Sequence, residues 1–65
     1  MKIMFAENLR NFRTTKKISQ SELAKMVGVD RRTVSAWENK ICEPSYETLL
    51  KLCEIFDETL DNLLT

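Results

Sequence analysis

The sequence has 65 residues, of which 43% are hydrophobic and 31% charged, with one glycine, one proline and no net charge. These values predict a single small, helix-rich domain over residues 1–65. No apolar run approaches the roughly 18 residues of a membrane span and no signal-peptide core is present, so we expect a cytoplasmic protein without a membrane partner.

The first predicted helix covers roughly Phe5 to Lys16. Phe5, Leu9 and Phe12 are spaced i, i+4 and i+7 and form one apolar stripe. The polar residues 14–17 weaken the pattern, and we place the end of the helix there.

The next two helices are predicted to form a helix-turn-helix over residues 20–39. Ser19 and Glu22 have the spacing of a capping box for the second helix, and Asp30 is suited to cap the third. Between these helices lies Gly28, the residue type that a sharp corner with positive φ favours. Two helices that meet there at a steep angle bring five apolar side chains into one interior: Leu23, Val27, Val29, Val34 and Trp37. The third helix, Arg31 to Asn39, is then the one that would enter a DNA major groove.

The last two predicted helices follow a loop that ends at Pro44. Ser45 is the expected cap of the fourth helix and Thr59 that of a short fifth helix. The inward-facing residues of the fourth helix are predicted to be Tyr46, Leu49, Leu52, Cys53 and Phe56. The fifth helix carries Leu60, Leu63 and Leu64. The expected fold class is therefore all-α.

Although the net charge of the chain is zero, the charges are distributed unevenly along it. Residues 1–40 contain nine basic and four acidic residues, a net charge of +5, whereas residues 41–65 contain one basic and six acidic residues, a net charge of −5. The basic part coincides with the predicted helix-turn-helix. Uneven surface charge is common in small domains, but this coincidence favours an interaction with phosphate.

The residues of catalytic and metal sites are largely missing. The sequence has no histidine, and its two cysteines, Cys42 and Cys53, do not have the spacing of a zinc site. Cys53 falls on a buried helical stripe, where a thiol behaves as a small hydrophobic group, and Cys42 lies in a loop. We therefore expect no metal, no cofactor, no small-molecule effector and no enzymatic activity.

Over almost its whole length the sequence resembles the phage repressor and Cro-type helix-turn-helix proteins, also called the xenobiotic-response-element family. The residues that carry the resemblance are Leu9-Arg10, Phe12-Arg13, Ile18–Ala24, Val27–Val29, Thr33–Ser35, Trp37-Glu38, Pro44-Ser45, Leu49–Leu52 and Thr59–Leu64. The resemblance implies a five-helix, lambda-repressor-like domain with a central helix-turn-helix. It also implies sequence-specific binding to double-stranded DNA by a homodimer that regulates transcription.

The same resemblance implies roles for individual residues at the DNA. Those implied to contact bases are Arg31, Arg32, Ser35 and Ala36, although both arginines could instead touch phosphate or pair with Asp30. Those implied to contact phosphates are Gln20, Thr33, Asn39 and Lys40. Relatives usually have glycine where Lys40 stands, so this lysine must adopt a left-handed conformation or shift that conformation to Asn39.

Two further sets of residues are implied to be architectural. Arg13 and Glu38 are the positions of an ion pair that joins the first helix to the end of the third. Ile55, Leu60 and Leu64 are the expected homodimer interface. Two functions remain open from the sequence: a DNA-binding transcriptional regulator, with a repressor favoured, and an antitoxin-like interaction module that binds a partner protein and binds DNA only secondarily.

Overall fold

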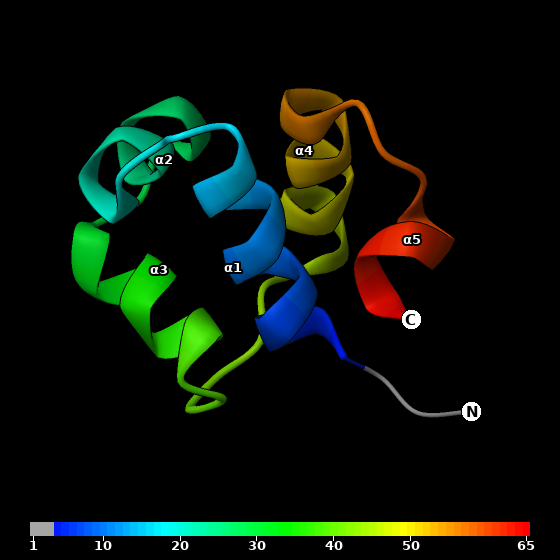
Figure 1. Ribbon diagram of the computed structural model, residues 1–65. Helices are drawn as coiled ribbons and strands as arrows, with labels where there is room; N and C mark the ends of the chain where they lie inside the picture. The colour runs from blue at the N-terminus through cyan, green and yellow to red at the C-terminus, as the bar shows by residue number, and fades with distance from the viewer. Residues whose placement is uncertain (1–3) are drawn as a thin grey trace.

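The computed structural model describes residues 4–65, which form five helices and their connecting turns (Figure 1). The helices are α1 (Phe5–Thr15), α2 (Gln20–Val27), α3 (Arg31–Glu38), α4 (Tyr46–Phe56) and α5 (Leu60–Leu64). No strand is present in this part of the chain. The predicted all-α, five-helix class is confirmed.

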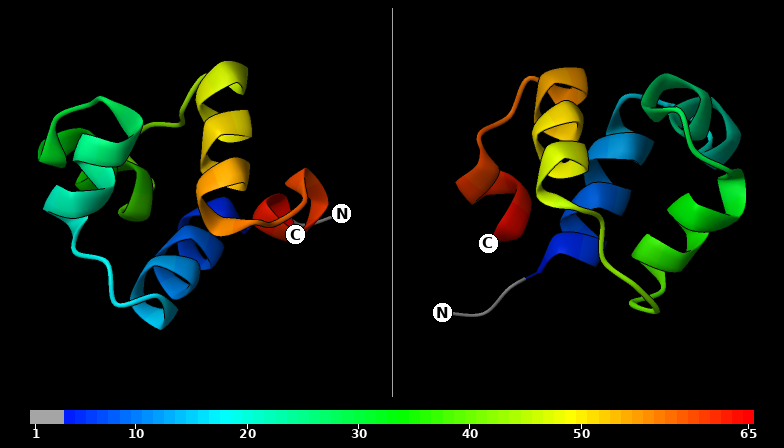
Figure 2. Two further views of the ribbon diagram at one scale, coloured as in Figure 1. Left: turned by 90° about the horizontal axis from the view of Figure 1, so that it is seen from above. Right: turned by 180° about the vertical axis from the view of Figure 1, so that it is seen from behind.

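Helices α1 and α4 occupy the middle of the molecule. The pair α2 and α3 lies on one side of the molecule and α5 on the other, with α1 and α4 between them (Figures 1 and 2). Helix α1 packs against α3 and α5, while α4 packs against α2 and α5. Hydrogen bonds tie α5 to the start of α1. The Met4 amide donates to the Leu64 carbonyl at 2.7 Å, and the Asn8 side-chain amide donates to the carbonyls of Asn62 and Leu63 at 3.2 and 3.1 Å.

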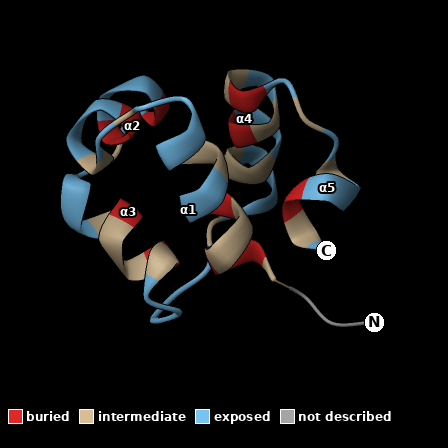
Figure 3. Ribbon diagram, viewed as in Figure 1, coloured by how far each residue is buried: buried red, intermediate tan, exposed pale blue. Residues whose placement is uncertain are grey.

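The core lies where the apolar stripes of all five helices meet (Figure 3). Its buried side chains are Phe5, Leu9, Leu23, Ala24, Val27, Val34, Trp37, Leu52, Phe56 and Leu63. Phe12 is partly buried, and its ring lies 5.9 Å from that of Phe56 between centroids, which joins α1 to the end of α4. Val29 and Cys53 pack against the same core from its edge.

The predicted N-terminal caps are confirmed at four helices. Ser19 accepts a hydrogen bond from the Glu22 amide, and the Glu22 carboxylate accepts one from the Ser19 amide, which completes the capping box of α2. Asp30, Ser45 and Thr59 cap the next three helices in turn. Each side chain satisfies an amide that the first helical turn leaves without an internal partner.

The helix C-termini use left-handed residues, and only one of these is glycine. Gly28 has φ 90°, as predicted for the corner between α2 and α3. Lys17, Lys40 and Asp57 take φ values of 58°, 62° and 53° at the ends of α1, α3 and α4. At each of these three, the following amide bonds back to a carbonyl in the last turn, as in the Schellman motif.

The prediction that Tyr46 faces inward is wrong, since 64% of this residue is exposed. Tyr46 is the first residue of α4 and lies at the margin of the helix's apolar stripe. Its turn precedes the buried part of the helix, where Leu52 and Phe56 enter the core.

Candidate nucleic-acid interface

The face of α3 that points away from the core carries the residues implied to read bases. Val34 and Trp37 bury the opposite face, so the helix cannot rotate without losing both contacts. Arg31 and Arg32 are exposed in its first turn, and Ser35 and Ala36 are half-buried in the middle. Asn39 is exposed at the C-terminal end and donates from its side chain to the Ser35 hydroxyl at 3.2 Å.

Asp30 caps α3 without forming an ion pair with either arginine. Its Oδ1 accepts a hydrogen bond from the Arg32 backbone amide at 2.9 Å. Among residues 4–65 the ion pairs are those of Arg13 with Glu38 and of Lys40 with Glu7. The guanidinium groups of Arg31 and Arg32 are therefore not engaged by Asp30 in this structure.

An ion pair between Arg13 and Glu38 fixes α3 to α1. The Arg13 Nε lies 2.7 Å from Glu38 Oε2, and its Nη2 lies 3.1 Å from Oε1, so the contact is bidentate. The third guanidinium nitrogen donates to the Ile18 carbonyl at 2.8 Å. Only 13% of the Arg13 side chain and 4% of the Glu38 side chain are exposed, so this pair is shielded from solvent.

Gln20 extends this network from the ion pair to the start of α3. Its Nε2 donates to Glu38 Oε1 at 3.1 Å, and its Oε1 lies 3.5 Å from Arg31 Nη1. The structure thus brings together one residue implied to contact phosphate and one implied to read a base. Because Glu38 is held by Arg13, the position of the Gln20 amide is tied to the packing of α1 against α3.

Thr33 and Lys40 lie apart from this group. Thr33 is half-buried, and its backbone amide donates to the Asp30 carbonyl at 2.9 Å. Lys40 takes the left-handed conformation itself, while Asn39 has φ −96°. The Lys40 side chain extends towards α1, where its Nζ lies 2.8 Å from Glu7 Oε1. No sequence pattern pointed to Glu7, because it lies 33 positions before Lys40 and stands within an ordinary amphipathic helix.

A sequence model of the helix-turn-helix family, described simply as "Helix-turn-helix", matches residues 9–63. The chain belongs to the helix-turn-helix family. Curated relatives of the chain in sequence are named as a transcriptional regulator and a repressor. One is the uncharacterized HTH-type transcriptional regulator YqaE of Bacillus subtilis, which is 41% identical over 61 residues, 94% of this chain and 53% of the relative.

A second relative is the Repressor protein C2 of Salmonella phage P22, 39% identical over 61 residues, 94% of this chain and 28% of that protein. The crystal structure of P22 c2 repressor protein in complex with a synthetic operator superposes with a TM-score of 0.89, covering 95% of this chain and 94% of that one at 39% identity. The chain spans about half the length, or less, of the first curated relatives that it matches.

The helix-turn-helix fold also occurs within a larger enzyme. This chain superposes on hydroxypropylphosphonic acid epoxidase from S. wedmorenis with a TM-score of 0.86 and 29% identity. The match covers 94% of this chain and 32% of the epoxidase chain. Fold similarity alone therefore does not assign a function, which has to be argued from the site.

In this helix-turn-helix chain, the residues expected at a dimer interface lie on two helices. Leu60 and Leu64, one turn apart on α5, are half-buried, and so is Ile55 on α4. Ile55 and Leu64 also pack against the core. Within residues 4–65 no cluster of three or more metal-binding side chains occurs, and no helix there is both long and apolar enough to cross a bilayer.

Proposed function

We propose that this chain binds double-stranded DNA sequence-specifically and regulates transcription, with α3 in the major groove. The observation that carries the proposal is the face of α3 that points away from the core, where Arg31 and Arg32 are exposed and Arg31 lies next to Gln20. The chain is also 39% identical to the P22 c2 repressor, whose crystal structure is a complex with a synthetic operator, and this similarity supports the same proposal. A helix fits the major groove of B-DNA, and an arginine can bond to both O6 and N7 of guanine.

Within this proposal, base edges are read by Arg31, Arg32, Ser35 and Ala36. The residues that contact phosphates are Gln20, Thr33, Asn39 and Lys40. Gln20 has a second task, because its Oε1 lies 3.5 Å from Arg31 Nη1. By limiting where the Arg31 guanidinium points, it reduces the side-chain entropy lost when that group binds a base.

The functional unit is a homodimer, acting as a repressor on an inverted-repeat operator. One recognition helix reads about four base pairs, too few to define one genomic site, so two subunits are needed. A two-fold contact through Ile55, Leu60 and Leu64 places the two α3 helices about 34 Å apart, one turn of B-DNA. If sedimentation with operator DNA found one subunit per site, a module that serves mainly to bind a partner protein would be favoured instead.

The test compares Arg31→Ala and Arg32→Ala with Lys51→Ala on a preferred duplex and on one of scrambled sequence. Lys51 lies on α4, so its replacement removes the same charge away from α3. It also removes the hydrogen bond that the Lys51 Nζ donates to the Val27 carbonyl at 3.2 Å, a loss that weakens binding to both duplexes alike because it does not depend on base sequence. At least one arginine variant should lose preference for the first duplex by roughly tenfold or more, since a bidentate pair gives about 1–3 kcal/mol of discrimination. Lys51→Ala should keep that preference. Unchanged preference in both arginine variants would contradict base reading by the start of α3.

A further inference from the structure

The ammonium group of Lys40 forms an ion pair with Glu7. Its Nζ lies 2.8 Å from Glu7 Oε1, with 69% of the Lys40 side chain and 45% of the Glu7 side chain exposed. The same ammonium is one of the proposed phosphate contacts. One exposed lysine is therefore both a proposed phosphate contact and the partner of a carboxylate within the same chain.

The backbone of Lys40 holds the root of this side chain in place. The Lys40 amide donates to the Trp37 carbonyl at 3.3 Å, and the Ile41 amide donates to the Ala36 carbonyl at 2.9 Å. With φ 62°, Lys40 adopts a conformation that costs a lysine more than a glycine. The end of α3 thereby fixes where the lysine starts, and only its side chain is free to change direction.

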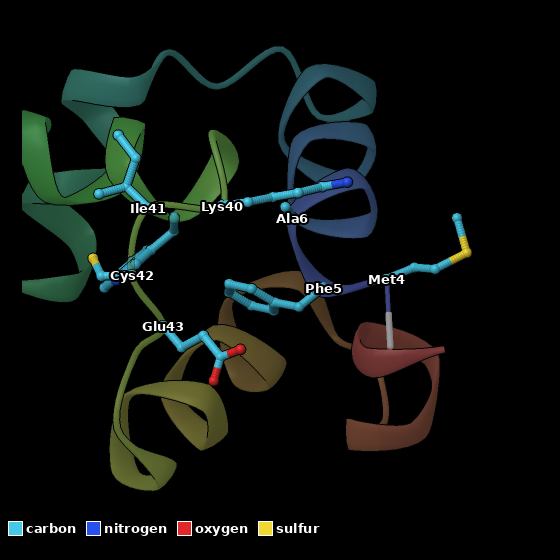
Figure 4. Close-up of a pocket in the computed structure, with 8 residues that line it drawn as sticks. Met4, Phe5, Ala6, Lys40, Ile41, Cys42 and Glu43 are labelled. Atoms are coloured by element: carbon cyan, nitrogen blue, oxygen red, sulfur yellow. The ribbon is translucent and has the colours of Figure 1, made fainter. Parts of the chain in front are cut away.

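The side chain itself has room to move. Lys40 runs from the end of α3 towards α1 along the rim of an open hollow of about 510 Å³ (Figure 4). Phe5, Ala6, Trp37 and Ile41 also line this hollow. Because the stem borders open space, the ammonium can leave Glu7 without any rearrangement of the core.

We propose that Glu7 competes with DNA phosphate for the Lys40 ammonium and so sets how tightly the protein holds duplex DNA. The proposal rests on the DNA-binding function argued above. A phosphate that approaches Lys40 must displace the carboxylate or share the cation with it, and sharing brings two anions close together. Neither Glu7 nor Lys40 is proposed to touch a base, so Glu7 lowers affinity for all sequences alike.

The experiment is a double-mutant cycle of Glu7→Gln and Lys40→Gln, read out as affinity for a preferred duplex and for one of scrambled sequence at low and moderate salt. Glutamine preserves most of the length of both side chains, and at position 40 it bears a left-handed strain similar to that of lysine. Glu54→Gln on α4 is the matched control, because it removes the same charge from an exposed position on another helix. Circular dichroism establishes that each variant is folded.

At low salt, Glu7→Gln should tighten binding about 2- to 5-fold per subunit, the range expected for release of an exposed ion pair. In the Lys40→Gln background the same change should have less than half that effect, and Glu54→Gln should leave affinity nearly unchanged. Higher salt should shrink the gain, because exposed charges are screened. The ratio of affinities for preferred and scrambled duplexes should stay constant.

Equal gains from Glu7→Gln with and without Lys40 would overturn the proposal, since they would show simple repulsion of DNA by Glu7. A gain no larger than that of Glu54→Gln would overturn it as well. Both results leave DNA binding itself intact. If neither the wild type nor Glu7→Gln bound any duplex, the proposed function would fail, and the competition with it.

Discussion

At the scale of single residues, the shielded pair of Arg13 and Glu38 carries more structural weight than any other charged contact described. Glu38 accepts hydrogen bonds from Arg13 and from Gln20, so one carboxylate connects α1, α2 and α3. Arg13 and Glu38 could be singled out from the sequence because they match positions of the resembled family. The link from Gln20 to Arg31 needed the structure, since it depends on how two side chains on different helices turn.

Replacing Glu38 by glutamine should cost about 3–5 kcal/mol of unfolding free energy, because it leaves the Arg13 charge without its counterion in a shielded site. Glu7→Gln is the control: it breaks an exposed pair, for which a loss of at most about 1 kcal/mol is expected. Urea-induced unfolding followed by circular dichroism measures both. Similar losses in the two variants would show that the Arg13–Glu38 pair has no special role.

The two thiols should differ in reactivity. Burial raises the pKa of the Cys53 thiol above its usual range, and the nearby charge of Glu58 raises it further, so less thiolate is present at a given pH. Cys42 is exposed. A disulfide reagent at neutral pH should therefore modify Cys42 well before Cys53, as peptide mass spectrometry over time will report. Faster labelling of Cys53 would mean that the end of α4 opens readily.

At the scale of the helices, the starts could be predicted from sequence better than the ends. A cap such as Ser19 or Asp30 is recognisable because its side chain itself makes the hydrogen bond to the helix. The left-handed ends at Lys17 and Asp57 were not identified, because the expected signal for them is glycine and the chain has only one. Tyr46 was misplaced for a related reason: periodicity gives the direction of a side chain but not where the core stops.

Lys17→Gly and Asp57→Gly should each raise the unfolding free energy by about 0.5–1 kcal/mol. Glycine relieves the left-handed strain of roughly 1–2 kcal/mol, and its greater freedom in the unfolded chain cancels part of the gain. Thermal unfolding measures the change. Gly28→Ala is the converse control. No atom lies within 4 Å of the added Cβ, so any loss of unfolding free energy comes from the φ of 90° at residue 28. If the Lys17→Gly variant were less stable than the wild type, the contacts of the lysine side chain would contribute more to stability than the left-handed strain costs.

The pH dependence of the α2 cap follows from Glu22. Hydrogen bonds from the backbone and side chain of Ser19 lower the pKa of this carboxyl below its usual value. Folding therefore favours the ionised form of Glu22. Its contribution to the free energy of unfolding is fully present above the usual pKa of a glutamate and is lost as the pH falls through the lowered pKa of the folded state. NMR titration should show that Glu22 ionises at a lower pH in the folded protein than in an unfolded peptide of the same sequence. An unshifted titration would mean that the capping box is open in solution.

At the scale of the whole molecule, the charge asymmetry follows the division into helices. Helices α1 to α3 fall within residues 1–40, whose net charge is +5, and α4 and α5 fall within residues 41–65, whose net charge is −5. In the proposed complex, the helices with net positive charge are the ones that meet phosphate. The overall fold and most of the candidate interface could be anticipated from sequence, whereas the pairing of Lys40 with Glu7 could not, because it depends on how α1 passes the end of α3.

In the proposed complex, α3 reads DNA sequence as part of a symmetric dimer. Repeated selection from a pool of random duplexes by the purified protein, followed by sequencing, tests this most directly. We expect enrichment of an inverted repeat whose half-site centres lie about 10–11 base pairs apart. Enrichment of a single unrepeated half-site would contradict the dimer, and a selected pool no different from the starting one would contradict sequence-specific binding itself.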